Sequence, residues 1–332
     1  MTSTPTVLIT GVGGQDGTYL AEKLLERDWT VWGTRQPGSH AKHNPDLPST
    51  VKIIEADLSE SKTAQDVITE IRPHYVMHLA ALSSVGQSWE RPLETAQVNG
   101  LAAIALMEEC LALTKSGERK VRFVNASSAE IFAGAGEVPQ TEQSPIVPIS
   151  PYGSAKAFSH NMVGSYRSRG LSASNAILYN HDSPRRPTSF VTRKITAGVA
   201  QIAAGNIDTI SLGNLDSMRD WGWAPDYVDA MTRIALADEP DDFVIATGEA
   251  HTVRAFVIAA FAAAGIPCWS DHVVIDPRFN RPADSGVLLG NARKAHRVLG
   301  WKPTKTFKQV VTAMVEHDMD LVARGLVGPQ IP

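Results

Sequence analysis

The stretch TVLITGVGGQDGTYL at residues 6–20 decides the fold. Its first five residues, Thr6–Thr10, form an apolar β-rich run, and helical spacing of leucines follows the stretch. Between the two, Gly11, Gly14 and Gly17 give a G-x-x-G-x-x-G turn. In a dinucleotide-binding turn the first glycine allows the tight bend, the second the approach of a pyrophosphate, and the third close helix–strand packing. The helix start then offers free N–H groups and a positive dipole end to phosphates. The predicted cofactor contacts of the turn are Gly11, Gly14, Gln15, Asp16 and Gly17.

Strand and helix patterns alternate regularly beyond this turn. Strands are predicted at residues 30–34, 51–56, 75–81, 121–126 and 173–179, and helices at 61–71, 92–113 and 155–169. The strand runs lack period-two alternation, as expected when both faces of a parallel sheet are covered. The pattern predicts an α/β fold, a Rossmann-type doubly wound parallel sheet.

The second half of the chain is less regular. It predicts helices at 190–205, 226–237 and 253–264, strands at 209–212 and 242–247, and two further helical patterns within 289–324. We expect residues 1–180 to form an NADP-binding Rossmann domain, to which 226–248 return. We expect 181–225 and 249–332 to form a smaller C-terminal α/β substrate-binding domain.

Composition excludes several classes of protein. The 332 residues include 31 Lys+Arg and 35 Asp+Glu, a net charge of −4, so binding to nucleic acid or to an anionic membrane is not expected. The N-terminus lacks the pattern of a signal peptide, and the uncharged stretch 255–269 is too short to span a bilayer, which predicts a cytoplasmic protein. Two cysteines among apolar neighbours, Cys110 and Cys268, are expected to be packed thiols, and no metal site is predicted.

The end of the second predicted strand bears on the choice of cofactor. An NAD site usually has an Asp or Glu there, whereas this chain has Thr34-Arg35-Gln36. An arginine suits the 2′-phosphate of NADP, although Arg35 could also be an ordinary surface side chain. Asp57, at the end of the third strand, could bind the adenine edge.

A catalytic group is predicted from two nearby segments. Tyr152 and Lys156 are four residues apart and share one helix face, so the ammonium is expected to lower the pKa of the phenol. Ser128 and Glu130 end the fifth strand, where side chains face the ligands of an open α/β sheet. Ser128 can bind a reacting hydroxyl, and Glu130 adds an acid/base that simple alcohol oxidation does not need. A helix-capping serine and a solvated glutamate are the structural alternative.

These motifs together resemble the extended short-chain dehydrogenase/reductase family, and within it the bacterial GDP-mannose 4,6-dehydratases. The resemblance covers nearly the whole chain. Four stretches carry it: GVGGQDGTYL (11–20), LYNHDSPRRPTSFVTRKI (178–195), LGNLDSMRDWGWAPDYV (212–228) and DPRFNRPAD (276–284).

The chain departs from that family pattern at three places. Ala129 stands where the family has a hydroxyl or an Asp, Ser84 where it has a His, and Gln36-Pro37-Gly38 where it has further arginines.

The resemblance also implies ligand contacts. For the cofactor these are Tyr152 and Lys156 together with Leu58, Leu79, Ala80 and Ala81. For the substrate they are Ser84, Asn180, Val191, Lys194, Gly213, Asn214 and Asp284. Arg185, Arg193, Arg219 and Arg281 lie in the same stretches, and guanidinium groups can clamp a diphosphate in a bidentate manner.

The implied function is an NADP-dependent lyase of deoxysugar biosynthesis that converts GDP-mannose to GDP-4-keto-6-deoxymannose by internal hydride transfer. A homodimer or homotetramer is expected. Two alternatives stay open: a related nucleotide-sugar epimerase, reductase or variant dehydratase acting on another sugar, and a non-catalytic NADP-binding sensor.

Overall fold

The computed structural model describes residues 4–38, 44–279 and 286–328. Its main feature is a parallel seven-stranded sheet in the order β10-β6-β5-β4-β1-β2-β3. The strands are β1 (Thr6–Thr10), β2 (Thr30–Arg35), β3 (Lys52–Glu55), β4 (Tyr75–His78), β5 (Arg122–Ser128), β6 (Ser172–Leu178) and β10 (Asp242–Ile245). From β1 the next strands, β2 and β3, are added on one side, whereas β4 and the strands after it are added on the other side. Ligands of such sheets bind at this switch point between β1 and β4. The predicted Rossmann-type fold is confirmed.

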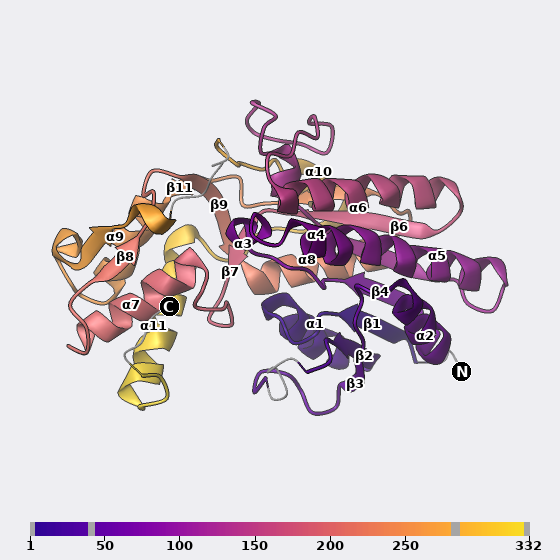
Figure 1. The fold of residues 1–332 in the computed structure, drawn as a ribbon, viewed down its shortest axis with the longest axis horizontal. Helices are drawn as coiled ribbons and strands as arrows, with labels where there is room; N and C mark the ends of the chain where they lie inside the picture. Colours follow the sequence, from indigo (N-terminus) through magenta and orange to yellow (C-terminus); the bar gives the residue numbers. More distant parts are fainter. Residues whose placement is uncertain (1–3, 39–43, 280–285, 329–332) are drawn as a thin grey trace.

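Helices cover both faces of this sheet (Figure 1). On one face α1 (Gln15–Leu25) and α8 (Ala224–Leu236) share a core with the sheet. On the other face lie α2 (Ser61–Ile71), α5 (Ala102–Lys115) and α6 (Pro151–Ser168), around a second core. The two cores account for the continuous apolar strand runs, because neither face of the sheet meets solvent.

The predicted helix 92–113 is interrupted in its middle. The structure has α4 (Pro92–Ala96), a π-helical segment Gln97–Leu101, and then α5, with the short α3 (Val85–Ser88) before them. In the π-helical segment the Asn99 amide donates to the carbonyl of Leu82 (3.0 Å) and accepts from its N–H (2.8 Å). Among the described residues, Pro92–Lys115 is the one helical stretch long and apolar enough to cross a membrane. This stretch packs against α2 and α6 and contributes buried side chains to the second core, as a core helix does.

A second lobe lies beside the sheet (Figure 1). Its strands are β7 (Asn180–Asp182), β9 (Met218–Trp223) and β11 (Ala250–Thr252) in one sheet, and β8 (Ile210–Leu212) with β12 (Val273–Ile275) in another. Its core is formed with α7 (Val191–Ala203), α9 (Val253–Ala263) and α11 (Phe307–Ala323). Single turns of 3-10 helix are present at Ala129–Phe132, Trp269–His272 and Pro277–Phe279. The sequence did not predict β7, β9, β11 or β12.

The segment before α11 returns to the main sheet, unlike the expected grouping of 249–332. Leu288 and α10 (Arg293–Leu299) join the core around α8, and Trp301 lies edge-on to Tyr227 at 6.0 Å between ring centroids. The Trp301 indole also donates to the carbonyl of Asp226 at 2.7 Å. Cys268 differs from expectation as well, because it is exposed while Cys110 is buried.

Candidate active site

The glycine turn joins β1 to α1 and depends on two of its glycines for steric reasons. Gly11 has φ +68°, and a Cβ there would lie 2.9 Å from the backbone of Ala80. A Cβ on Gly17 would lie 2.6 Å from the carbonyl oxygens of Gly11 and Val12. Larger residues at these positions would push α1 away from β1 and β4.

The start of α1 fits a dinucleotide phosphate group. Gly14 is the N-cap, no side chain caps the helix, and a Cβ on Gly14 would make only an ordinary contact at 3.4 Å. The backbone N–H groups of this first turn are therefore available to an anion. We conclude that the residues present fit a nicotinamide dinucleotide.

The other predicted cofactor positions surround the same turn. Leu79 and Ala80 follow β4, and both N–H groups donate to the Thr10 hydroxyl at 3.1 Å, which holds them beside Gly11, with Ala81 next in the chain. Arg35 ends β2 and pairs with Glu55 at 2.9 Å. Asp57 lies two residues beyond β3, accepts from the Ser59 N–H and hydroxyl, and is followed by the buried Leu58.

Tyr152 and Lys156 lie on the first turns of α6. The helix begins earlier than the predicted residue 155, because Ser150 caps it by accepting from the Gly153 N–H (3.0 Å) and Pro151 occupies its first turn. Gly153 permits the close approach of α6 to residue 130, since a Cβ would lie 2.8 Å from the Glu130 carbonyl oxygen. The buried Lys156 ammonium donates to the carbonyl of Ala126 in β5 at 2.9 Å.

The electrostatics of this pair differ from the expectation. Burial raises the pKa of Tyr152 to about 12, and the nearby Glu130 and Asp16 carboxylates add to the rise, so the predicted lowering is wrong for this structure. A hydrogen bond from Ser128 and the charge of Arg186 act in the opposite direction. Burial also lowers the pKa of Lys156 to about 8. Both shifts reflect desolvation, which disfavours the charged form of either group.

Ser128 and Glu130 lie where β5 ends, as predicted. The Ser128 hydroxyl accepts from the Glu130 N–H at 3.2 Å, which sets the turn Ala129–Phe132. Ala129 is buried, with 2% of its surface exposed, and points into the core instead of toward the site. The structure therefore brings Ser128, Glu130 and Tyr152 together beside Asp16 of the glycine turn.

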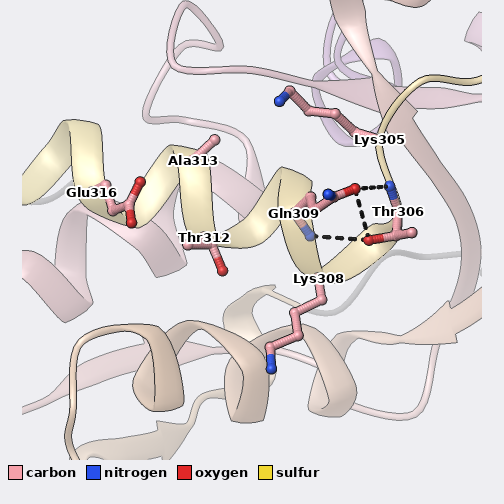
Figure 2. Close-up of a pocket in the computed structure, with 7 residues that line it drawn as sticks. All are labelled: Lys305, Thr306, Lys308, Gln309, Thr312, Ala313 and Glu316. Carbon is pink, nitrogen blue, oxygen red and sulfur yellow. Dashed lines mark hydrogen bonds between the residues drawn. The ribbon is translucent and has the colours of Figure 1, made fainter.

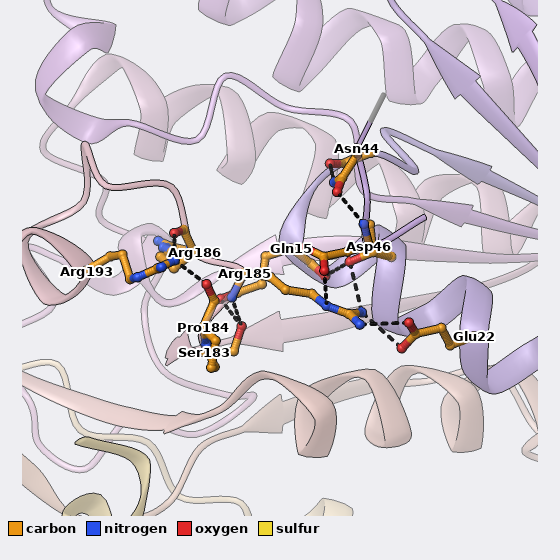
Figure 3. A network of polar contacts seen from close by, with 11 residues as sticks. Gln15, Glu22, Asn44, Asp46, Ser183, Pro184, Arg185, Arg186 and Arg193 are labelled. Carbon is orange, nitrogen blue, oxygen red and sulfur yellow. Dashed lines mark hydrogen bonds and ion pairs between the residues drawn. The ribbon is translucent and has the colours of Figure 1, made fainter. Parts of the chain in front are cut away.

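The arginines of the segment after β7 take three different positions (Figure 3). Arg185 reaches back to α1 and pairs with both carboxylate oxygens of Glu22, at 2.9 and 2.7 Å. Arg193 is buried and pairs with Asp318 of α11. Carboxylates of the protein therefore hold two of the four arginines that were expected to clamp a diphosphate.

Arg186 lies close enough to Tyr152 for its charge to act on the phenol, and the sequence reasoning missed it. It stacks over Phe190 at 3.7 Å and pairs with Asp182 at 3.4 Å. Its charge acts on Tyr152 and Asp16 alike. The sequence offered two adjacent arginines and no means of deciding which one faces the site.

His181 was also missed. Its ring pairs with the Asp16 carboxylate at 2.9 Å and stacks on Tyr227 at 4.4 Å between ring centroids. Burial alone would lower the pKa of His181, but the Asp16 carboxylate outweighs it and leaves that pKa raised. Burial alone would raise the pKa of Asp16, but the His181 ring, through its charge and hydrogen bond, leaves that pKa lowered. Gln15 completes the junction, since its amide donates to the His181 carbonyl (3.2 Å) and accepts from the Ser183 hydroxyl (2.8 Å). His181 is far from the glycine turn in the sequence, so its position along the chain gave no sign that it contacts Asp16.

The remaining substrate candidates are distributed over the second lobe and the rim of the sheet. Arg219 is buried in β9, Asn180 begins β7, and Val191 and Lys194 lie on the first turn of α7. Ser84 caps α3, and Asn214, next to Gly213, accepts from the Asp216 N–H at 2.9 Å. Arg281 and Asp284 lie outside the described residues.

A separate pocket of about 380 Å³ lies on the exposed side of α11 (Figure 2). It is lined by Lys305, Thr306, Lys308, Gln309, Thr312, Ala313 and Glu316. Thr306 and Gln309 cap the helix reciprocally there, which gives them a structural role. The described residues proposed for catalysis do not line it.

Comparison with known proteins decides the family. The sequence model of the GDP-mannose 4,6 dehydratase family matches residues 8–314. The chain belongs to this family. GDP-mannose 4,6 dehydratase 2 of Arabidopsis thaliana is 41% identical over 96% of this chain and 87% of its own length. The GDP-mannose 4,6-dehydratase sdnI of Sordaria araneosa is 39% identical over 96% of this chain, which spans 61% of that longer protein.

Solved structures of the wider superfamily share the fold. The UDP-glucose 4-epimerase of Thermus thermophilus, in complex with NAD, has a TM-score of 0.81 and 26% identity, covering 97% of this chain and all of its own. The predicted resemblance to the extended short-chain dehydrogenases and to the dehydratase family within it is confirmed.

Proposed function

We propose that this protein is a nucleotide-sugar 4,6-dehydratase that converts GDP-mannose to GDP-4-keto-6-deoxymannose with NADP as its cofactor. The observation that carries the proposal is the placement of Glu130 beside Tyr152 and Ser128, next to the glycine turn. An oxidation needs only the tyrosine, lysine and serine, whereas an elimination also needs a carboxylate. Membership of the dehydratase family supports the same reaction.

Tyr152 acts first in the proposed sequence. As a phenolate it removes the proton of the hydroxyl group on carbon 4 of the sugar, while Ser128 hydrogen-bonds the phenol and favours the charged form. When bound, the oxidised nicotinamide cofactor supplies a positive charge, takes a hydride from the sugar and returns it, so the net reaction is redox-neutral. The Lys156 ammonium, held by the Ala126 carbonyl one helical turn along α6 from Tyr152, stabilises the phenolate by its charge.

Glu130 performs the elimination. The ketone on carbon 4 acidifies the proton on carbon 5, which the Glu130 carboxylate removes. The same proton leaves with the hydroxyl group of carbon 6 as water. The hydride would then return to carbon 6, carbon 5 takes a proton that exchanges with solvent, and Tyr152 releases the proton that it removed, so each group is restored. Ala129 has no group that could share this work, so Glu130 serves as base and then as acid.

The test incubates the pure protein with catalytic NADP⁺ and a panel of GDP- and UDP-sugars, followed by mass spectrometry. We expect GDP-mannose to lose the mass of one water without net formation of NADPH. A product of unchanged mass would assign an epimerase. Turnover only in a parallel incubation with NADPH, which is then consumed in step with the sugar, would assign a reductase. Binding of NADP⁺ without turnover of any sugar would assign a sensor.

Arg35 supports the choice of NADP. It ends β2 and pairs with Glu55 on the neighbouring strand, whose side chain is about half exposed. Arg35→Ala should weaken NADP⁺ binding by about 1.5–3 kcal/mol, the value of a hydrogen bond to a charged group, and leave NAD⁺ binding unchanged. Titration calorimetry with both nucleotides measures this difference. Equal NADP⁺ affinity of variant and wild type would assign the 2′-phosphate to another residue.

A homo-oligomer is proposed on the basis of exposed apolar side chains. Four apolar side chains at least 40% exposed lie on α6 or on the segments that contact it: Trp89 directly after α3, Leu93 on α4, Leu101 in the π-helical segment and Phe158 on α6. Exposed apolar side chains gathered on packed helices mark protein–protein contacts.

A further inference from the structure

Five polar residues form one row across the middle of the parallel sheet. The strand registers pair Thr10 with His78, His78 with Asn125, Asn125 with Asn175, and Asn175 with Asp242. Residues paired in this way point to the same face, here the face covered by α6. The first four are buried, with 1% or less of their surface exposed.

Hydrogen bonds give this row a direction. Asp242 carries a carboxylate, which accepts from the Asn175 amide at 2.9 Å and pairs with Arg167 at the sheet edge. Because the Asn175 amide nitrogen donates to Asp242, the Asn175 amide oxygen faces Asn125. It accepts a hydrogen bond from the Asn125 amide nitrogen, also at 2.9 Å. The Asn125 amide oxygen therefore points along the row toward β4.

The other end of the row fixes the state of His78. The Thr10 oxygen accepts from Leu79 and Ala80, so its hydroxyl proton donates to Nδ1 of His78 at 2.9 Å. Burial, with the charge of Lys156 as a second cause, lowers the pKa of His78 to about 3, so the ring is neutral. A neutral ring that accepts at Nδ1 carries its proton on Nε2.

Two complementary atoms remain at the centre of the row. His78 Nε2, a donor, and Asn125 Oδ1, an acceptor, are both buried and have no hydrogen-bond partner among the described residues. They belong to registered neighbours on β4 and β5, yet no direct bond joins them. Lys156 lies over the same strands, with one hydrogen bond, to Ala126 next to Asn125. Buried polar atoms of this kind are normally satisfied, and a gap longer than a hydrogen bond is commonly bridged by water.

We propose that His78 Nε2 and Asn125 Oδ1 bind one ordered water that also accepts a hydrogen bond from the Lys156 ammonium, and that His78 is thereby a positioning residue for Lys156. The water has three partners, the usual number for a buried water. It accepts from His78 and Lys156 and donates to Asn125, so every bond in the row from Thr10 to Asp242 runs in one direction.

The consequence for Lys156 is electrostatic. An acceptor on the ammonium favours its charged form and so opposes the effect of burial on the pKa of Lys156. The other titratable groups near the site are Tyr152 and His160 on α6, Glu130 after β5, Asp16 on α1, and Arg186. The Asp242–Arg167 pair closes the far end of the row.

The first test is a high-resolution crystal structure of the wild-type protein with bound NADP. We expect a water at about 2.7–3.2 Å from His78 Nε2, Asn125 Oδ1 and Lys156 Nζ. A direct bond between His78 and Asn125, or a site without that water, overturns the proposal. This measurement does not depend on turnover, so it remains decisive even if the proposed dehydratase activity, on which the role of Lys156 rests, is not found.

The second test compares pH profiles of kcat for GDP-mannose dehydration. His78→Phe keeps the ring shape and removes the donor, so the alkaline decline should move down by about one pH unit, as Lys156 loses its proton more readily. His78→Gln restores an N–H near the position of Nε2 and should return the profile toward that of the wild type. His160→Gln removes a buried histidine of α6 outside the row and should leave the alkaline decline in place. Equal profiles for His78→Phe and wild type, or the same shift in His160→Gln, would show a merely structural role.

Discussion

Tyr152 illustrates how burial and neighbouring charge compete at a single residue. Its pKa of about 12 is set by desolvation, and Ser128 is the hydrogen-bonding group that opposes the rise. Removing that hydrogen bond leaves the phenol harder to ionise. We therefore predict that Ser128→Ala raises the pKa of Tyr152 and moves the rising limb of the kcat profile to higher pH.

The matched control is Tyr152→Phe. It should bind cofactor and substrate normally but lose about 10²–10⁴-fold in kcat, the usual contribution of a general base. Stopped-flow pH profiles and nucleotide titrations measure both effects. Near-normal turnover of Tyr152→Phe would remove the phenol from the mechanism.

Glu130 allows the two halves of the reaction to be separated. Glu130→Gln keeps the size of the side chain and the N–H that Ser128 accepts from, but loses the base. We predict oxidation at carbon 4 without elimination, so that a 4-keto sugar and NADPH absorbance accumulate in one turnover. In deuterated water the wild type should place deuterium at carbon 5. Dehydration by Glu130→Gln at the wild-type rate would assign the elimination to another group.

At residue level the sequence predicted the positions of side chains at strand and helix ends better than the orientation of side chains in loops. Ser128, Glu130 and Tyr152 were predicted because strand ends and a four-residue helix spacing determine where side chains face. Arg185 and Arg186 could not be told apart, since a loop has no periodicity from which direction can be inferred. The pKa of Tyr152 was also beyond the sequence, because desolvation depends on the complete fold around the phenol.

At the scale of elements, Arg193 and Asp318 hold α7 to α11. Both side chains are less than 10% exposed, and Thr196 also donates to Asp318, at 2.6 Å. Arg193→Met leaves the carboxylate buried without a positive charge beside it, so we predict a loss of about 3–5 kcal/mol in the free energy of unfolding.

The double variant Arg193→Met/Asp318→Leu supplies the control. It should recover most of the stability in urea denaturation, because no charge is left buried alone. An unchanged stability of Arg193→Met, together with a raised KM for the sugar, would instead favour the substrate-clamp role.

Three of the four strands that the sequence missed are short, and β9, with six mostly buried residues, is the exception. The central strands followed from short apolar runs, and α2 followed from apolar residues at helical spacing. β7, β11 and β12 have three residues each and are only partly buried, so no periodic signal was present. The π-helical turn at Gln97–Leu101 was equally hidden, because an extra residue in a helical turn leaves the apolar pattern nearly unchanged.

At the scale of the whole molecule, the exposed apolar side chains on α4 and the π-helical segment predict self-association. Leu93 is 81% exposed and Leu101 53% exposed. The variant Leu93→Glu/Leu101→Glu should shift the protein to monomer, as measured by light scattering after gel filtration. The exposed Ile258→Glu, in the second lobe, should leave the mass of the assembly unchanged. A wild-type protein that is already monomeric would contradict the prediction.

The overall topology was predictable because a parallel sheet built from β-α-β units admits few arrangements. The return of α8 and β10 to the main sheet was expected, whereas that of Leu288 and Trp301 was not. The latter depends on how single side chains fill the space beside Tyr227, and no local pattern encodes that packing.

The junction of Gln15 and Asp16 with His181 and Ser183 bears on the lifetime of the bound nucleotide. The turn proposed for the pyrophosphate is tied to the segment that leads into the second lobe by hydrogen bonds of 2.8–3.2 Å and an ion pair of 2.9 Å. Departure of the nucleotide past this segment requires these bonds to open together. A redox-neutral enzyme regenerates its oxidised cofactor in every cycle and gains nothing from exchanging it. We therefore expect the nucleotide to behave as a prosthetic group, which co-purifies with the protein and dissociates far more slowly than the sugar product.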